Sequence, residues 1–162
     1  MNLLKEGDIA PSFSFRNADG TSHSTDNLKG TTFVVYFYPR DDTPGCTKEA
    51  CGFRDQWEKF QEAEVTVIGV SADSEESHNK FRNKYDLPFA LAADEDKAIV
   101  QAYGTWGEKS MMGRTYQGIH RVTYLVDTDG RIAKVYPKVK PNEHAEQILQ
   151  DLDRIYSKAP RE

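Results

Sequence analysis

The stretch TFVVYFYPRDDTPGC (residues 32–46) is the strongest indication of the fold expected for this chain. Its first half, 32–38, is a continuous run of β-branched and aromatic residues, which is typical of a strand buried on both faces of a parallel sheet. A turn with two prolines follows, and a helix is predicted from about Pro44 to Ala63. Because open α/β sheets place their sites at the carboxyl ends of strands, we expect a site around Cys46, which opens this helix.

The same alternation continues along the chain, with strands predicted over 65–72 and 89–94 and helices over 74–85 and 95–103. Ser74 is a plausible cap for the helix that follows it. Two hairpins are predicted, one over 13–25 with its turn at Asp19-Gly20 and one over 121–137 through Asp129-Gly130. A long Gly-rich loop is expected over 104–120. The chain closes with an amphipathic helix over 142–156, with Ile148, Leu152 and Ile155 on one stripe. In the long loop, we expect Trp106, Met111 and Met112 to pack in the core or at its rim, and a role in access to the pocket is the alternative.

Together these segments predict a single α/β domain over 1–162, with a mixed central β-sheet flanked by helices and an N-terminal β-hairpin. The length of 162 residues suits one domain with a real core, as do 38% hydrophobic and 29% charged residues. With 21 basic and 26 acidic residues the net charge is −5, which argues against nucleic acid or an anionic membrane as a partner.

The chain shows no pattern for export or membrane insertion. No apolar run approaches the ~20 residues that a membrane span needs. The stretch MNLLKEGDIAPSF has no basic region followed by an apolar one, so we expect no signal peptide and a cytoplasmic protein. Its two cysteines do not resemble a disulfide scaffold, which leaves a redox or nucleophilic role and inert burial both open.

Helix geometry keeps the two cysteines, Cys46 and Cys51, apart. At about 100° per residue Cys51 falls about 140° around the helix from Cys46, and their Cα atoms are roughly 8.6 Å apart, whereas a disulfide needs less than about 7 Å. A bond between them therefore requires this turn to unwind, and Gly52 lowers the cost by up to ~1 kcal/mol. The apolar residues within about 40° of Cys46 are Ala50, Phe53, Trp57 and Phe60.

The start of this helix is well suited to a thiolate. Pro44 fits the first helical position and Thr43 the cap before it, so Cys46 takes the third position, beside free backbone N–H groups and the positive end of the helix dipole. Both features favour a thiolate, which is a nucleophile. On composition alone Cys46 could equally be a small buried hydrophobe, and Cys51 an incidental thiol.

The histidines do not indicate a metal site. The four of them, His23, His78, His120 and His144, are dispersed, and no Cys/His cluster has zinc spacing. We therefore assign no metal.

The same residues carry a family resemblance. PRDDTPGC contains the Pro-x-x-x-Thr-x-x-Cys pattern of the peroxiredoxins, as Pro39, Thr43 and Cys46. GCTKEACGFRD (45–55) then resembles the PrxQ subfamily, also called bacterioferritin comigratory protein, in which a second cysteine lies five residues after the first. Further stretches that look like this subfamily are GDIAPSF, VYFYPR, GVSADS, YGTWGEKSMMGRTYQGIHRVTYLVDTDG and the closing helix.

The resemblance implies a thioredoxin-like fold and a thiol peroxidase that acts on hydrogen peroxide and alkyl hydroperoxides. Cys46 matches the peroxidatic cysteine, which becomes a sulfenic acid, and Cys51 the resolving cysteine, which closes an intramolecular disulfide. Thr43 matches the hydroxyl that hydrogen-bonds the thiolate and peroxide, Pro39 the residue that screens the pocket from water, and Arg121 the arginine that supports the thiolate. Thioredoxin or glutaredoxin would be the reductant, the chain would be a monomer, and no cofactor is implied.

Other interpretations of the residues remain. A thioredoxin-type oxidoreductase is disfavoured because the sequence lacks Cys-x-x-Cys. A redox-sensing or chaperone-like binding protein on the same fold is separated from a peroxidase by peroxide turnover without a client, and a purely structural domain predicts two ordinary thiols. By type alone Pro39 could end a strand, Thr43 could only cap the helix, and Arg121 could be a surface residue.

Overall fold

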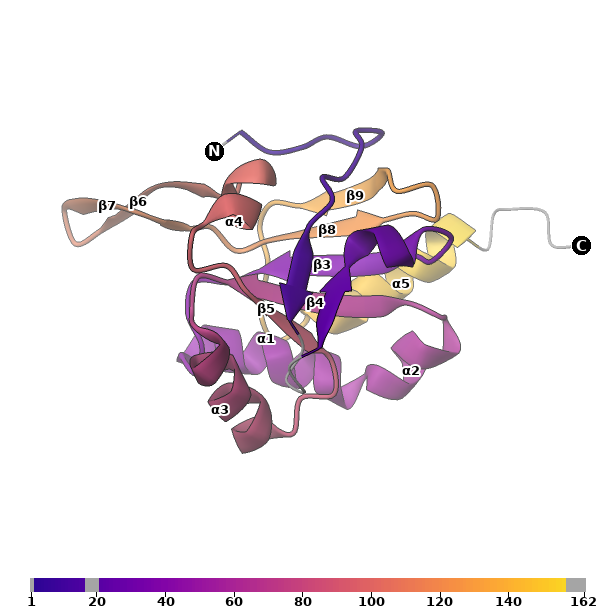
Figure 1. Ribbon diagram of the computed structural model, residues 1–162, viewed down its shortest axis with the longest axis horizontal. Helices are drawn as coiled ribbons and strands as arrows, with labels where there is room; N and C mark the ends of the chain where they lie inside the picture. The colour runs from indigo at the N-terminus through magenta and orange to yellow at the C-terminus, as the bar shows by residue number, and fades with distance from the viewer. Residues whose placement is uncertain (1, 17–20, 157–162) are drawn as a thin grey trace, which may run out of the picture.

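The structure is a computed structural model that describes residues 2–16 and 21–156 (Figure 1). At its centre is a five-stranded sheet in the order β5-β4-β3-β8-β9. Its strands are β3 (Phe33–Phe37), β4 (Thr66–Ser71), β5 (Ala90–Ala93), β8 (Val122–Val126) and β9 (Ile132–Tyr136). Strands β3, β4 and β5 pair in parallel, and β8 pairs antiparallel with both of its neighbours, β3 and β9, which confirms the predicted mixed sheet.

Helices and two small hairpins complete the chain. The helices are α1 (Pro44–Asp55), α2 (Trp57–Glu62), α3 (Glu75–Tyr85), α4 (Ala98–Ala102) and α5 (His144–Tyr156), with a short 3-10 turn over Thr25–Leu28. The hairpins pair β1 (Ser14–Arg16) with β2 (Ser22–Ser24), and β6 (Trp106–Met111) with β7 (Arg114–Ile119). No helix in the described part of the chain is long and apolar enough to cross a membrane.

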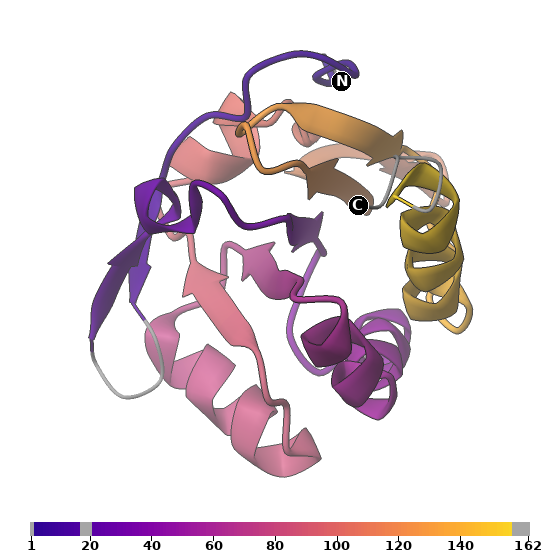
Figure 2. The same cartoon turned by 90° about the vertical axis from the view of Figure 1, so that its right-hand side faces the viewer.

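Strand β3 is buried on both faces, because other elements pack against each side of the sheet. Its side chains alternate, so that Val34 and Tyr36 face one side of the sheet and Val35 and Phe37 the other. The first side packs against α1, α3 and α5, and the second against α4 and the N-terminal segment. Figure 2 shows the yellow and magenta helices on one side and the indigo N-terminal segment on the other. All four side chains are fully buried.

The hairpins predicted over 13–25 and 121–137 are confirmed as β1–β2 and β8–β9. Phe15 pairs with His23 in the first, whose turn at Asp19-Gly20 lies outside the described residues. In the second, Gly130 has φ of 78°, the left-handed conformation that glycine adopts without strain. Ser74 also caps α3 as predicted, since its hydroxyl accepts a hydrogen bond from the backbone N–H of Ser77 at 3.1 Å.

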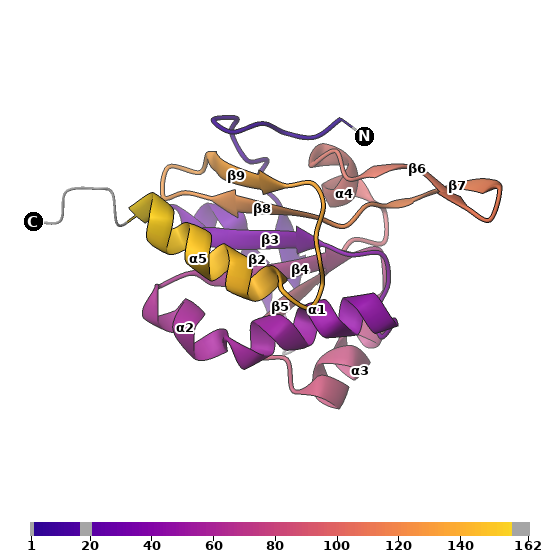
Figure 3. The same ribbon diagram turned by 180° about the vertical axis from the view of Figure 1, so that it is seen from behind.

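The prediction of a loop over 104–120 is wrong, because most of this segment forms the β6–β7 hairpin. The hairpin projects from the body of the molecule (Figures 1 and 3). Met111 pairs with Arg114, so Met112 and Gly113 form a two-residue turn, and both have positive φ, as a type I′ turn requires. Met111 and Met112 are 62% and 97% exposed. They therefore do not pack in the core, and Trp106 is half-buried.

Two further details of the helices differ from prediction. The helix expected over 44–63 is divided at Gln56, whose φ and ψ of −101° and 9° lie outside the helical region, so that α1 and α2 are separate. The stripe on α5 is shorter than expected, because Ile148 and Leu152 are buried but Ile155 is 37% exposed. The buried face of α1 agrees with prediction, since Phe53 lies in the core beside Tyr36, with ring centroids 4.8 Å apart.

Candidate active site

The turn between β3 and α1 sets the position of the helix start. Thr43 has an extended backbone (φ −92°, ψ 158°) and is the cap residue, with Pro44 at the first helical position. Its side chain makes no capping hydrogen bond, and its hydroxyl instead donates to the carbonyl of Arg40 at 3.0 Å. The hydroxyl oxygen therefore keeps lone pairs that can accept a further hydrogen bond.

Strand register brings Arg121 to Cys46. In the antiparallel pair of β3 and β8, Phe37 lies opposite Val122, so the residue before β8 is placed beside the end of β3, where α1 begins. The guanidinium Nη2 of Arg121 donates to the Sγ of Cys46 at 3.3 Å. Cys46 is only 1% exposed. A buried sulfur thus has a permanently charged guanidinium as its hydrogen-bond donor.

Glu49 is part of this site, although the sequence reasoning missed it. It lies three residues after Cys46, on the same face of α1, and its Oε1 accepts a hydrogen bond from Nη1 of Arg121 at 2.7 Å. Burial raises the pKa of Glu49 to about 7, although the charge of Arg121 opposes this shift. Burial also acts to lower the pKa of Arg121, but the charges of Glu49 and Cys46 outweigh it and raise that pKa.

Gly45 is a second residue that the sequence reasoning missed. A Cβ atom at this position would lie 3.1 Å from Nη2 of Arg121 and 3.8 Å from Cγ of Pro141. The first of these distances is tighter than ordinary packing, so glycine gives the guanidinium room to lie over the first turn of α1. The P-G-C order in the sequence is the only hint of this, because the contact is made by Arg121, which lies far along the chain, just before β8.

Cys51 occupies a different environment, five residues along α1. Both cysteines are free thiols, Cys46 buried and Cys51 half-buried. Burial raises the pKa of Cys51, with partial opposition from the charge of Arg54. The next residue, Gly52, faces α5, where a Cβ would make ordinary contacts of 3.8 Å with the carbonyl oxygen of Pro141 and 3.9 Å with Cβ of Ala145.

Pro39 lies where β3 gives way to the turn, and it is half-buried. Its neighbour Tyr38 is fully buried and extends the β3–β4 pairing, because its backbone N–H bonds to the carbonyl of Val70 at 3.1 Å. The structure therefore brings Cys46, Arg121 and Glu49 into direct contact. Thr43 and Pro39 lie on the chain that leads to them, and Cys51 lies further along α1.

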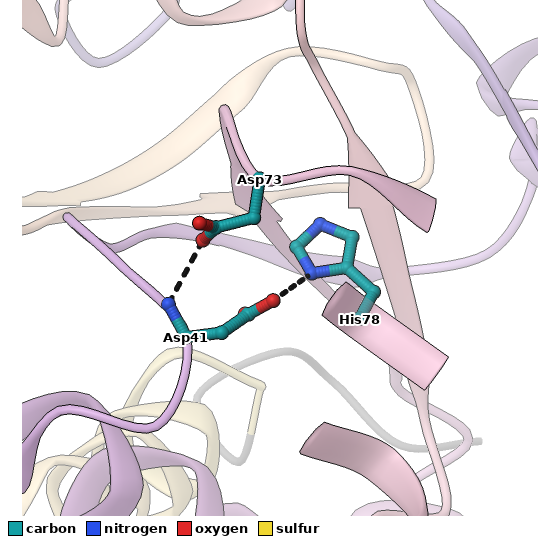
Figure 4. A group of neighbouring side chains, drawn as sticks. All are labelled: Asp41, Asp73 and His78. Atoms are coloured by element: carbon teal, nitrogen blue, oxygen red, sulfur yellow. Dashed lines mark hydrogen bonds and ion pairs between the residues drawn. The ribbon is translucent and has the colours of Figure 1, made fainter. Parts of the chain in front are cut away.

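Among residues 2–16 and 21–156, one group of side chains could offer ligands to a metal ion. Asp41, Asp73 and His78 each present an atom within 4.8 Å of the others (Figure 4). Each of the three is already engaged in hydrogen bonds, however, as with the 2.7 Å contact between His78 and Asp41. This arrangement satisfies the group without a metal.

The fold and the two free thiols of α1 define the class of protein, and comparison with known proteins identifies the family. The family described as AhpC/TSA matches residues 7–135, and the chain belongs to this family of peroxiredoxins, within its Bcp or PrxQ group. It is 45% identical over 146 residues to a putative peroxiredoxin Bcp of Coxiella burnetii, covering 90% of this chain and 97% of that protein. It is also 45% identical over 149 residues to peroxiredoxin Bcp of Escherichia coli K12, covering 92% and 96%.

Solved structures agree with this grouping. A cysteine mutant of PrxQ from Xylella fastidiosa has a TM-score of 0.89 at 30% identity and covers 96% of this chain and 99% of its own. The bacterioferritin comigratory protein of Xanthomonas campestris, described for its alkyl peroxide reduction activity, has a TM-score of 0.83 at 34% identity and covers 88% and 91%. The thioredoxin-like fold is thus confirmed. The protein is a thiol-dependent peroxidase that uses peroxides as substrates and a thioredoxin-type reductant.

Proposed function

We propose that Cys46 is the nucleophile of this peroxidase. Its thiolate sulfur attacks one oxygen of the peroxide, the O–O bond breaks, and the other oxygen leaves as water or an alcohol after taking up a proton. Sulfur is oxidised to a sulfenic acid while the peroxide is reduced. The observation that carries this proposal is the 3.3 Å hydrogen bond from Arg121 to the Sγ of Cys46, a buried sulfur at the start of a helix.

Arg121 would serve both ends of this displacement. Negative charge moves from the sulfur to the leaving oxygen during the reaction, and a guanidinium with five donors can follow it without losing its own proton. Glu49 accepts from Nη1, which leaves Nη2 directed at the sulfur. We therefore assign Glu49 the role of a positioning residue that fixes the plane of the guanidinium.

Thr43 and Pro39 complete the proposed pocket. The hydroxyl of Thr43 donates to the carbonyl of Arg40, so its oxygen is oriented to accept a hydrogen bond from the peroxide O–H. Pro39 has no backbone N–H, so at this position it adds apolar cover without a polar group that water would solvate.

Cys51 is the proposed resolving residue. Its thiol attacks the sulfenic sulfur of Cys46, a disulfide forms, and the hydroxyl leaves as water. The helix between the two must unwind for this step. Unwinding would also expose Cys51 to water and remove the burial that raises its pKa, so the thiol would become more reactive as the helix opens.

The finer assignments follow from this scheme. Hydrogen peroxide and small alkyl hydroperoxides are the proposed substrates, and thioredoxin or glutaredoxin the dithiol that reduces the exposed disulfide. Resolution within one chain needs no second subunit, so we propose a monomer and a single domain. Two free thiols that depend on a dithiol reductant suit the cytoplasm, and the surplus of acidic residues suits a protein without nucleic acid or membrane partners.

The experiment is to titrate the fully reduced protein with hydrogen peroxide and then map its peptides without reduction. We expect about one peroxide consumed per chain and a disulfide between Cys46 and Cys51 in the same chain. Thioredoxin and its reductase should then restore the dithiol and sustain turnover. Consumption without this disulfide would overturn the role of Cys51, and no consumption with both thiols still free would overturn the whole scheme.

A further inference from the structure

The turn that leads to Cys46 is held from outside by α3. The carboxylate of Asp41, two residues before Thr43, accepts hydrogen bonds from the hydroxyls of Tyr38 at 2.6 Å and Ser77 at 2.8 Å. The same carboxylate lies 2.7 Å from Nδ1 of His78. Its backbone N–H donates to Asp73 at 2.8 Å, as Figure 4 shows. The turn is therefore tied to α3 and to the segment before it by both side chain and backbone.

The hydrogen bonds of His78 hold its ring between two parts of the fold. Nε2 lies 3.0 Å from the carbonyl oxygen of Ala92 in β5, which can only accept, so Nε2 carries a proton. Nδ1 lies 2.7 Å from Oδ2 of Asp41, within hydrogen-bond distance. Both ring nitrogens therefore have a partner, and the ring links Asp41 to β5.

This hydrogen-bonded pair is buried, which distinguishes it from a second link between the same turn and the same helix. The side chains of His78 and Asp41 are 3% and 4% exposed. The neighbouring Asp42, by contrast, pairs with Lys84 at 2.8 Å, and these side chains are 40% and 58% exposed. Exposed ion pairs contribute little, whereas a buried polar group that is left without its partner is costly. The two links thus provide a matched comparison on one turn.

We propose that His78 is a positioning residue for the peroxidase reaction, whose buried ring holds Asp41 through the Nδ1 hydrogen bond and so fixes the turn before Cys46. This inference rests on the proposed function of Cys46. In that scheme α1 must unwind after Cys46 while the chain before it keeps Thr43 and the nucleophile in place. A fixed anchor on the near side of Cys46 confines the unwinding to the far side, where Cys51 lies.

The contact between His78 and Asp41 should therefore affect peroxide attack more than disulfide closure. Peroxide attack needs Thr43, Cys46 and Arg121 in a set geometry, so it should slow when the turn loosens. Disulfide closure needs the helix to open, so it should not slow. A general loss of stability has no reason to separate the two steps in this way.

The first test measures the hydrogen bonds of His78 in the reduced wild-type protein by NMR of its ring nitrogens. We expect both nitrogens to be hydrogen-bonded, with couplings that identify Asp41 as the partner of Nδ1 and Ala92 as the partner of Nε2. An Nδ1 without a hydrogen bond would overturn the proposal. This test needs no variant and no activity, so its result is independent of the proposed function.

The second test compares His78→Asn with His78→Gln in stopped-flow experiments. The Asn amide can replace the Nδ1 hydrogen bond to Asp41, whereas the Gln amide reaches the position of Nε2 and replaces only the donor toward Ala92. We expect His78→Gln to lower the rate constant for peroxide attack about tenfold, because small misplacements of reacting groups are costly. His78→Asn should recover most of this loss, and the rate of disulfide formation should not fall in either variant.

Lys84→Ala is the matched control, since it removes the exposed pair with Asp42 and should leave both rates within about twofold of wild type. Melting curves establish that each variant is folded, and Asp41→Asn gives a second route if either His78 variant is not. Equal losses in peroxide attack and disulfide closure, or no loss in His78→Gln, would contradict the proposal. If the wild type itself consumed no peroxide, the proposed function would fail instead, whatever the NMR result.

Discussion

The two ends of the Cys46–Cys51 segment are held very differently. Cys46 is 1% exposed and accepts a hydrogen bond from Arg121, which is itself bound to the buried Glu49. Cys51 is half-buried, and within the described residues its thiol has no hydrogen-bond partner. This contrast indicates that the two sulfurs are prepared for different steps. One is fixed for attack on a small molecule, and the other is free to move once that attack has happened.

Replacing each cysteine in turn separates the two ends most completely. Cys46→Ser should abolish peroxide consumption, because the remaining thiol, Cys51, lacks the hydrogen bond that Arg121 donates to Cys46. Cys51→Ser should still consume one peroxide per chain and then stop, because its sulfenic acid has no partner thiol. A dimedone-type probe with mass spectrometry should trap that sulfenic acid. Normal cycling of Cys51→Ser with thioredoxin and no trapped product would show that the resolving role is wrong.

Removing the guanidinium should have the next largest effect. Arg121→Ala should lower the rate constant for peroxide attack by about 10²–10³, the range seen when a donor to developing charge is lost. Single-turnover kinetics measure the rate, and a melting curve checks the fold. Arg114→Ala, at an exposed position of β7, is the control. An equally small change in both variants would remove Arg121 from the site.

A methyl group at Gly45 should disturb the same contact more gently. Its Cβ would approach Nη2 of Arg121 to 3.1 Å, so the guanidinium must shift by a few tenths of an ångström. We expect Gly45→Ala to slow peroxide attack about tenfold. Gly52→Ala is the control on the other end, because its Cβ makes only ordinary contacts near 3.8 Å. It should leave peroxide attack unchanged and slow disulfide closure, since alanine stabilises the helix that must unwind.

Glu49 should affect stability rather than rate, and its effect is seen in the pH dependence of the free energy of unfolding. Its pKa is raised in the folded state, to about 7 from an ordinary value of 4.5, so the folded protein binds more protons than the unfolded chain between these values. Its contribution is therefore present at low pH and is lost as pH rises from about 4.5 to about 7. The free energy of unfolding, wild type minus Glu49→Gln, should fall by about 3 kcal/mol over this window.

The subtraction matters because another buried group titrates with the opposite sign. Burial lowers the pKa of His144 to about 4, so its contribution grows as pH rises through the same range. It is common to both proteins and cancels. Denaturant unfolding at several pH values measures the difference in free energy of unfolding between the two proteins. If this difference stayed constant or rose with pH, burial would not raise the pKa of Glu49.

Sequence reasoning reached the parts of the site that follow from local pattern. The apolar run of β3 and the turn chemistry of Thr43 and Pro44 predict where α1 begins, and the family motif adds Arg121. It did not reach Glu49, because a carboxylate on the buried face of a helix is understandable only once its distant partner, Arg121, is known. Gly45 was missed for the same reason.

The β6–β7 hairpin was missed for a different reason. Both of its faces are largely exposed, so its strands lack the alternation of apolar and polar residues that identifies a half-buried strand. Its turn places Met112 at φ of 51°, where asparagine or glycine is usual, so the sequence carries no hairpin signal there.

Amide hydrogen exchange over residues 46–53, measured in the dithiol and disulfide forms, is the sharpest test of the difference between the two ends. If the helix must unwind to join the cysteines, these amides should exchange much faster in the disulfide form, while those of β3 stay protected in both. Equal protection of 46–53 in the two forms would mean that the sulfurs meet without unwinding, and the proposed coupling of Cys51 reactivity to helix opening would be wrong.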